Sequence, residues 1–214
     1  MDLARVDTQR AYELIREKIT TLELKPGSSI DESKLAKEID TGLTPVREAL
    51  KLLIHEHLVE APPRGLYVTE VKIDELQKIS NIRLLLEPYT ARQAAKHATA
   101  DDLIILEALC QEQAEVPRDE PRQLFEVDHK FHHALAQAAD NKYLAQILEQ
   151  FYGLSQRLWF MALPHLGFLP DAVETHLEMV EAIKTGNGDR AAEIMREHIQ
   201  DFYDKVFKIL KEMD

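Results

Sequence analysis

The spacing of apolar residues predicts helices along almost the whole chain. In the first 54 residues, apolar positions recur three and four apart in three segments, 8–22, 32–39 and 44–54. Residues 58–70 break this pattern, because two short apolar runs flank Pro-Pro-Arg-Gly, as in a hairpin. From residue 73 onward only helical patterns follow, the clearest being 122–139, 171–184 and 189–210. The pattern predicts a mainly α protein in two parts, one with helices and a hairpin up to residue 70 and one with helices alone from residue 73 onward.

The order of elements in residues 1–70 is that of a winged helix-turn-helix, with three helices and a small β-hairpin. In such a fold the third helix fits the major groove of DNA, while the hairpin tip meets the backbone or the minor groove. Asp31 is expected to cap the second helix and Thr44 the third, with Pro45 at its first position. A three-helix bundle with a hairpin that binds no DNA would show the same pattern, so periodicity alone leaves DNA binding open.

The negative net charge of the chain does not exclude DNA binding by residues 1–70. The 214 residues hold 26 Lys and Arg against 38 Asp and Glu, a net charge of −12, which argues against a nucleic-acid partner. However, residues 71–214 carry −9 of this charge and residues 1–70 only −3. A DNA-contacting face must therefore be a local basic patch, with weak affinity for bulk DNA and a steep salt dependence.

Cysteine content and hydropathy indicate where the protein works. The single cysteine, Cys110, excludes a disulfide framework and favours a reducing, cytoplasmic location. No apolar run reaches the length of about 18 residues that a membrane span needs, and the N-terminus lacks the apolar core of a secretory signal. We therefore expect no membrane partner.

Residues 71–214 read as an all-α helical bundle into which one carboxylate and three imidazoles point. On the helix 122–139, Asp128 and His132 are an i, i+4 pair at the border of the apolar face, whereas the other two histidines fall on the far face. His176 lies in the middle of the apolar stripe of 171–184, and His198 falls within the apolar arc of 189–210.

A single buried histidine is more often a hydrogen-bonded core residue than a metal ligand. Four convergent groups are different, because burying them without partners would cost several kcal/mol. A divalent metal ion would bind all four, and one carboxylate with three imidazoles favours zinc or nickel, with manganese or iron as alternatives. The sequence thus predicts a metal site at Asp128, His132, His176 and His198.

The first part resembles the DNA-binding domain of the GntR family of bacterial transcription regulators over residues 8–70. The residues that carry the resemblance are Leu35-Ala36-Lys37-Glu38, the run from Thr44 to Leu50, Leu58-Val59-Glu60 and Arg64-Gly65. The resemblance implies contacts to phosphates or base edges from Thr44 and Arg47, and phosphate contacts from Lys34 and Lys37. It also implies that Gly65 lets the hairpin approach the DNA, with Arg64 beside it. Leu43 stands where many members have an arginine, so the family's usual operator does not carry over.

The second part is similar to the FCD-type effector domain of the FadR-like branch of the same family, over residues 74–208. This resemblance is carried by Ile82-Arg83, Leu86-Glu87, Asp128, Phe131-His132, Asp140-Asn141, His176, Ala182-Ile183, Gly188-Asp189, Met195 and His198. It implies a helical bundle whose central cavity holds the metal, with a small carboxylate effector on or beside it.

Two arginines are candidates for binding that carboxylate. Arg83 falls inside an apolar stripe, where a charged side chain needs a counter-charge. That counter-charge is either Glu87, one turn further on, or the effector, and the resemblance favours the effector. Arg157 is a weaker candidate of the same kind.

These observations predict a ligand-responsive regulator with a DNA-binding domain at 1–70 and a metal-binding, dimerising domain at 71–214. We expect a homodimeric repressor that binds double-stranded operator DNA and responds to a small organic acid. A direct metal sensor, or a structural metal with no effector, would leave the same sequence pattern. A metal-dependent hydrolase is disfavoured, because the chain has neither an HExxH motif nor a nucleophile paired with a base.

Overall fold

The chain forms two compact units, each described here by itself. The computed structural model describes residues 3–117, 119–166 and 170–213. One unit comprises the chain up to Lys72 together with Gly153–Met161, and the other comprises Ile73–Tyr152 together with the chain from Ala162 onward. The mainly α fold with a small antiparallel hairpin near the N-terminal end is confirmed.

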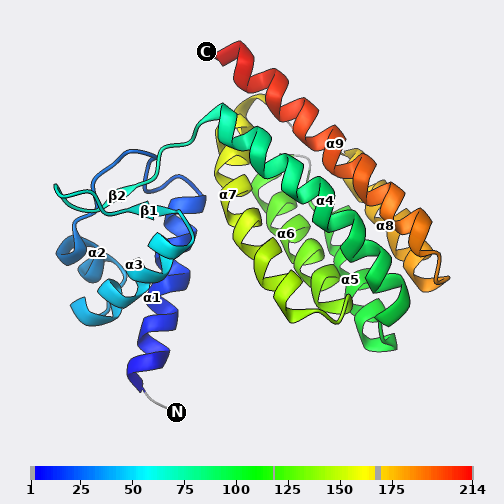
Figure 1. Ribbon diagram of the computed structural model, residues 1–214, viewed down its shortest axis with the longest axis horizontal. Coiled ribbons are helices and arrows are strands. Elements are labelled where there is room, and N and C mark those ends of the chain that lie inside the picture. Colours follow the sequence, from blue (N-terminus) through cyan, green and yellow to red (C-terminus); the bar gives the residue numbers. More distant parts are fainter. Residues whose placement is uncertain (1–2, 118, 167–169, 214) are drawn as a thin grey trace. The chain divides into compact units, whose positions relative to one another are not determined.

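The first unit has the element order of a winged helix-turn-helix (Figure 1). Its elements are α1 (Leu3–Thr20), α2 (Glu32–Glu38), α3 (Leu43–His55), β1 (Val59–Glu60) and β2 (Tyr67–Val68). The two strands are antiparallel, with Val59 opposite Val68 and Glu60 opposite Tyr67. Because side chains alternate across a strand, Val59 and Val68 face the same core while Glu60 is exposed.

The core of the first unit forms where α1 packs on α3. Ile15 and Ile19 of α1 are fully buried, as are Leu50 and Leu53 of α3, in one apolar cluster that also takes in Val68 of the hairpin. The three- and four-residue spacing of these positions is what the sequence pattern predicted. This packing fixes the orientation of α3, whose opposite face stays exposed.

Two helix starts differ in how they are capped. The side chain of Asp31 accepts hydrogen bonds from the backbone N–H groups of Ser33 at 2.9 Å and Lys34 at 3.0 Å, so this predicted cap is confirmed. The prediction of Thr44 as the cap with Pro45 at the first position is wrong, because α3 begins two residues earlier, at Leu43, and Gly42 occupies the N-cap without a side-chain bond. Thr44 is instead an exposed residue of the first helical turn.

The hairpin tip depends on Gly65. Its backbone N–H donates to the carbonyl of Pro62 at 3.1 Å, which closes the turn. Its φ angle is +132°, a conformation that residues with a side chain rarely adopt. A glycine here also keeps the exposed tip free of a Cβ atom.

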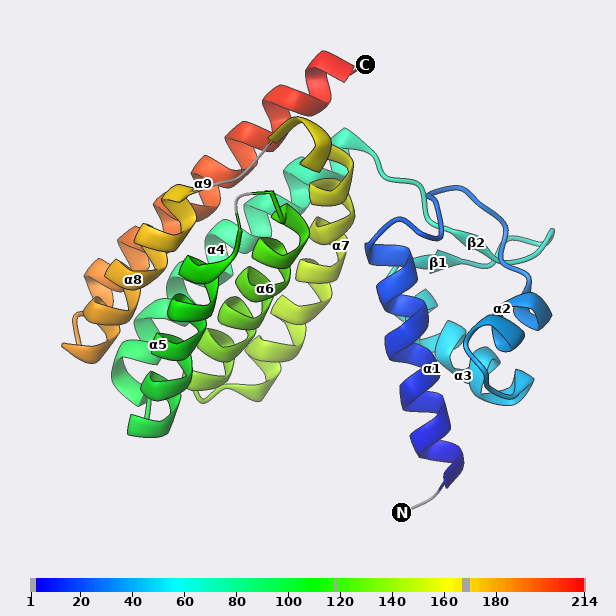
Figure 2. The same cartoon turned by 180° about the vertical axis from the view of Figure 1, so that it is seen from behind.

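The second unit is a bundle of long helices (Figures 1 and 2). Its helices are α4 (Ile73–His97), α5 (Ala100–Glu115), α6 (Pro121–Ala138), α7 (Lys142–Leu166, apart from its middle), α8 (Pro170–Lys184) and α9 (Gly188–Met213). Helices α4 and α9 lie side by side, and α6 and α8 complete a core in which Phe131, Met179 and Tyr203 are almost wholly inaccessible to solvent. Among the described residues, no helix is both long and apolar enough to cross a membrane.

Adjacent leucines of α3 provide a test of this packing. Leu53 is fully buried and Leu52 is 45% exposed, so these two neighbours in the sequence differ in burial. Leu53→Ala should lower the free energy of unfolding by about 2–5 kcal/mol, because it leaves a cavity in the core. Leu52→Ala, the control, should change it by no more than about 0.5 kcal/mol. Urea unfolding followed by circular dichroism measures both, and equal losses would contradict the assigned packing of α3.

Candidate metal centre

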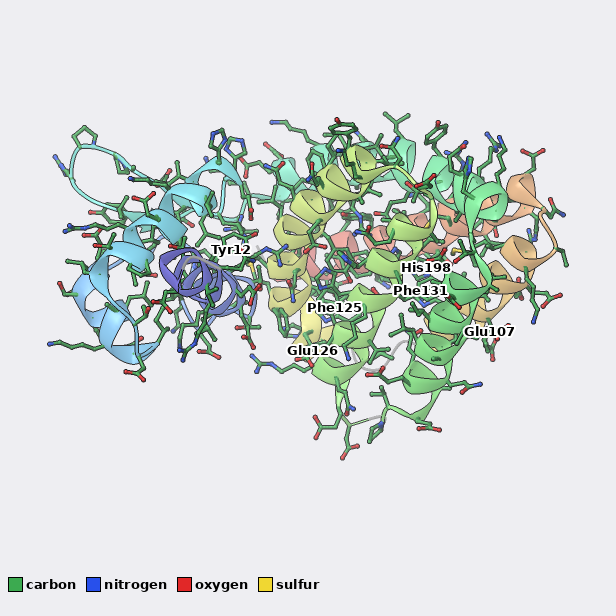
Figure 3. The ribbon with its side chains drawn as sticks, turned by 90° about the horizontal axis from the view of Figure 1, so that it is seen from below. Tyr12, Glu107, Phe125, Glu126, Phe131 and His198 are labelled. Carbon is green, nitrogen blue, oxygen red and sulfur yellow. The ribbon has the colours of Figure 1, made fainter. Side chains whose placement is uncertain are left out.

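The structure brings together the four predicted metal ligands. Helix α6 supplies Asp128 and His132, which are one turn apart, while α8 supplies His176 and α9 supplies His198. Each offers one nitrogen or oxygen atom, and these four atoms all lie within 4.8 Å of one another. Figure 3 shows His198 close to Phe131 inside the bundle, where side chains of several helices meet.

The separations of these atoms suit one small cation. Nε2 of His132 lies 3.2 Å from Nε2 of His198 and 3.8 Å from Oδ2 of Asp128, and Nε2 of His176 lies 3.7 Å from Oδ1 of Asp128. Ligand atoms about 2.0–2.2 Å from a tetrahedral zinc ion are about 3.3–3.6 Å from each other. Small rotamer adjustments therefore suffice to bring all four atoms onto one ion.

One ligand atom has no protein partner. His176 is fully buried, and its Nε2 finds no hydrogen-bond partner among the described residues. Such an atom costs about 1–3 kcal/mol unless something else satisfies it. Because this nitrogen faces a carboxylate and shares its surroundings with two other imidazoles, a divalent cation is the group that fits the site.

Groups behind three of the four ligands hold them in place. Nδ1 of His176 lies 2.8 Å from the amide oxygen of Gln113 on α5, and Nδ1 of His132 lies 2.8 Å from Oε2 of Glu87 on α4. The phenol of Tyr152 on α7 donates to Oδ2 of Asp128 at 2.9 Å. Outer partners of this kind orient metal ligands and raise their basicity.

His176 and His198 are held in the neutral form that binds a cation. Burial lowers the pKa of His176 well below its usual value, and the neighbouring His198 and His132 lower it further. Burial and the nearby His132 lower the pKa of His198 to about 4. Both rings are therefore neutral near pH 7 and present lone pairs, which is the form that metals bind.

Arg83 is paired with Glu87, the first of its two predicted counter-charges. Both side chains are buried, and Nε of Arg83 donates to Oε1 of Glu87. Burial alone would raise the pKa of Glu87, but the charges of Arg83 and His132 outweigh it and lower the pKa to about 2. Arg83 also lies over the rings of Tyr152 and Tyr203, 5.2 and 5.6 Å from their centroids. The guanidinium thus joins the outer part of the centre while its role in effector binding stays a prediction.

Arg157 is not among the residues of this cluster. It belongs to the part of α7 that groups with the first unit, and its Nη1 donates to the backbone carbonyl of Thr69 at 2.8 Å. Its predicted role toward the effector gains no support from this contact. His129 and His133 also stay outside the cluster, because both lie against Oε2 of Glu149, at 3.1 and 3.2 Å.

Sequence reasoning missed Gln113 as part of the site. A signal was present, because Leu106, Cys110 and Gln113 follow the helical spacing and are all fully buried on α5. A polar residue in such an apolar stripe needs a hydrogen-bond partner, and here the partner is a metal ligand. Tyr152 was missed because its position in the sequence has no helical spacing to any of the four ligands.

The predicted DNA-contacting residues lie exposed on the first unit. Thr44 and Arg47 occupy the first turns of α3, Lys34 and Lys37 lie on α2, and the hairpin tip carries Arg64 and Gly65. Acidic side chains accompany two of the cations.

Nε of Arg47 lies 3.1 Å from Oε2 of Glu32, and Nζ of Lys34 lies 3.8 Å from Oε1 of Glu38. Glutamates therefore lie beside two of the cations predicted to contact DNA and offset part of their charge.

Comparison with known proteins now identifies the family. Residues 7–68 match the family described as bacterial regulatory proteins of the gntR family, and residues 78–201 match the FCD domain. The two matches account for most of the chain and agree with the two predicted resemblances. The chain therefore belongs to the GntR family and carries an FCD domain.

Individual relatives agree with this assignment. The chain is 28% identical over 206 residues to the HTH-type transcriptional repressor RspR of Escherichia coli K12, which covers 95% of this chain and 90% of that protein. Its fold is similar to that of Escherichia coli McbR/YncC, with a TM-score of 0.85, 21% identity and coverage of 94% and 97% of the two chains. A putative GntR regulator from Rhodococcus sp. RHA1 is similar with a TM-score of 0.77, 18% identity and the same coverage.

These findings settle the class of protein. The chain is a DNA-binding transcription regulator and not an enzyme, since its family and its relatives are regulators. The hydrolase alternative is thereby excluded. The FCD assignment and the Asp/His cluster together indicate a domain able to bind a metal ion.

Replacing two ligands tests the metal centre. The double variant His176→Ala, His198→Ala should retain no stoichiometric zinc or nickel, because only one imidazole and one carboxylate remain. His133→Ala is the matched control, since this exposed histidine lies outside the cluster. Elemental analysis after metal loading and gel filtration measures the content, and an unchanged metal-to-protein ratio in the double variant would contradict the assigned ligands.

Proposed function

We propose that this regulator is a homodimeric repressor, acting in the cytoplasm, whose FCD domain binds a divalent metal, zinc or nickel, and a small organic acid. In this proposal residues 1–70 are the DNA-binding domain and residues 71–214 the effector-binding and dimerising domain. The observation that carries it is the convergence of Asp128, His132, His176 and His198, of which His132 and His176 are buried, and Nε2 of His176 has no hydrogen-bond partner among the described residues. The name of the repressor RspR supports repression.

The charges around the centre favour an anionic effector. In the metal-bound form, in which imidazole ligands are neutral, Asp128 and Glu87 would contribute two negative charges, and Arg83 with a divalent ion would contribute three positive ones. This leaves one positive charge in a buried region, which one carboxylate would neutralise. When bound, the metal would supply a Lewis-acidic position for a carboxylate oxygen.

Arg83 is the protein group best suited to assist. A guanidinium carries five N–H donors, and the contacts to Glu87 and Tyr203 engage Nε and Nη1. By this count the ion pair with Glu87 does not exhaust the donors of Arg83. We therefore keep Arg83 as the proposed effector-binding arginine and Arg157 as a lesser candidate.

The small volume of the cavity beside the cluster favours a second candidate function, a regulator that senses the metal itself. A cavity of about 20 Å³ lies beside the cluster, lined by residues that include Glu87, His132 and Tyr152. This is room for one or two water molecules rather than for an organic acid. An acid could enter only if side chains move, whereas a bare ion needs no further room.

Control of DNA follows from thermodynamic linkage. Two copies of the winged helix would read the two halves of a pseudo-palindromic operator, with α3 in the major groove and the hairpin tip at the backbone. An effector that favours a different spacing of these domains weakens operator binding. Operator binding must then weaken effector binding by the same factor.

Arg47 provides a test of the DNA-contacting face. Arg47→Ala should abolish specific operator binding, because an exposed side chain in the first turns of α3 reaches base edges or phosphates. The fold should persist, since Arg47 is exposed and its ion pair with Glu32 lies at the surface of the unit. A gel shift with the operator and with unrelated DNA measures the effect, and Lys25→Ala, an exposed cation between α1 and α2 that is not among the predicted DNA contacts, is the control. Unchanged specific affinity of the Arg47 variant would argue against the assignment.

A second experiment separates the acid sensor from the metal sensor. Operator affinity is measured for chelated protein, for zinc- or nickel-loaded protein, and for loaded protein with a panel of small organic acids. The proposal predicts that an acid changes the affinity at least tenfold, and only when the metal is present. A change caused by the metal alone, with none from any acid, would favour the metal sensor. No change in any arm would refute both.

A further inference from the structure

Gln113 is a buried polar residue on a helix that supplies no metal ligand. It lies near the end of α5, is wholly inaccessible to solvent and follows the apolar positions Leu106 and Cys110 on the same face. Its amide oxygen lies 2.8 Å from Nδ1 of His176. Its amide nitrogen has no hydrogen-bond partner among the described residues, so the side chain is held there at a cost.

The contact decides where the proton of His176 lies. A neutral imidazole carries one proton, on either Nδ1 or Nε2, and the hydrogen bond made by one nitrogen sets the state of the other. An amide oxygen can only accept, so Nδ1 of His176 must carry the proton and donate it to Gln113. Nε2 then holds a lone pair, and this is the nitrogen that lies among Asp128, His132 and His198.

We propose that Gln113 is a positioning residue that fixes His176 as the Nδ1–H tautomer and so presents its Nε2 to the metal. This inference rests on the metal binding proposed above and adds a residue of α5 to it. Phe131 stacks on the His176 ring, with centroids 3.9 Å apart and planes 14° apart, and holds the plane of the ring. Stacking is indifferent to which nitrogen carries the proton, so that choice falls to Gln113.

A neutral acceptor suits this position better than a charged one. The other outer acceptor, Glu87, is a carboxylate whose charge is offset by Arg83. Among the described residues His176 has no comparable cation beside it, so in the metal-free protein a carboxylate here would add an uncompensated negative charge, which a bound divalent ion would offset. Gln113 thus sets the tautomer without adding a negative charge to the centre.

The tautomer itself is the first test, made on metal-free protein. Long-range proton–nitrogen correlation spectra of ¹⁵N-labelled protein at pH 8 distinguish the two neutral forms of each histidine, and the His176 signal is assigned by its loss in His176→Ala. The wild type should show the Nδ1–H form, and Gln113→Met, which has similar length but no strong acceptor, should show a substantial Nε2–H population. A wild-type ring in the Nε2–H form would mean that the amide donates to Nδ1, and would overturn the proposal.

Zinc affinity is the second test, by competition with a chelating dye. Gln113→Met should bind zinc about 10–100-fold more weakly than the wild type. Gln113→Glu restores an acceptor and should recover most of that loss, which a merely space-filling role would not predict. Equal affinity of the Met variant and the wild type would overturn the proposal.

The two tests fail independently of each other. If the wild type binds no zinc, the proposed function fails, while the tautomer still decides the role of Gln113 at His176. If Gln113→Met does not fold, the wild-type tautomer and the zinc affinity of Gln113→Glu decide the question. A Gln113→Glu affinity within about tenfold of the wild type would support the proposal, and a complete loss would contradict it.

Discussion

Convergence of three imidazoles and one carboxylate, with His132 and His176 buried and Asp128 and His198 half-buried, is the constraint on which the second unit depends. Polar groups withdrawn from water need partners, and the partners here come from helices that supply no ligand, namely Gln113, Glu87 and Tyr152. Glu87 in turn requires Arg83, so a buried network extends from the ligands to the side of α4. Among the described residues Nε2 of His176 still lacks a hydrogen-bond partner, and a divalent cation would satisfy it.

Periodicity predicted much of this arrangement, because each ligand lies on an amphipathic helix. The one-turn spacing of Asp128 and His132 and the positions of His176 and His198 in apolar stripes were enough to infer that they converge. Sequence could not choose between Glu87 and an effector as the partner of Arg83, since both would satisfy the same buried charge. It also could not find Tyr152, because contacts between separate helices depend on packing that local spacing does not encode.

In the first unit, too, the sequence predicted the elements and the core but not every detail of the structure. Its elements and its core followed from apolar spacing and from the Pro-Gly turn, whose Gly65 adopts a positive φ angle. The exact start of α3 did not, because a good capping residue, Thr44, lies two positions inside the true cap at Gly42. Net charge was a poor guide to DNA binding because most of the excess acidity, −9 of −12, lies in residues 71–214.

The metal environment is the central claim, and X-ray absorption spectroscopy of the zinc-loaded protein tests it most directly. The account predicts one zinc ion per chain with three imidazole nitrogens and carboxylate oxygen at about 2.0–2.2 Å. Substoichiometric zinc, a sulfur ligand, or a shell dominated by water oxygens would contradict it.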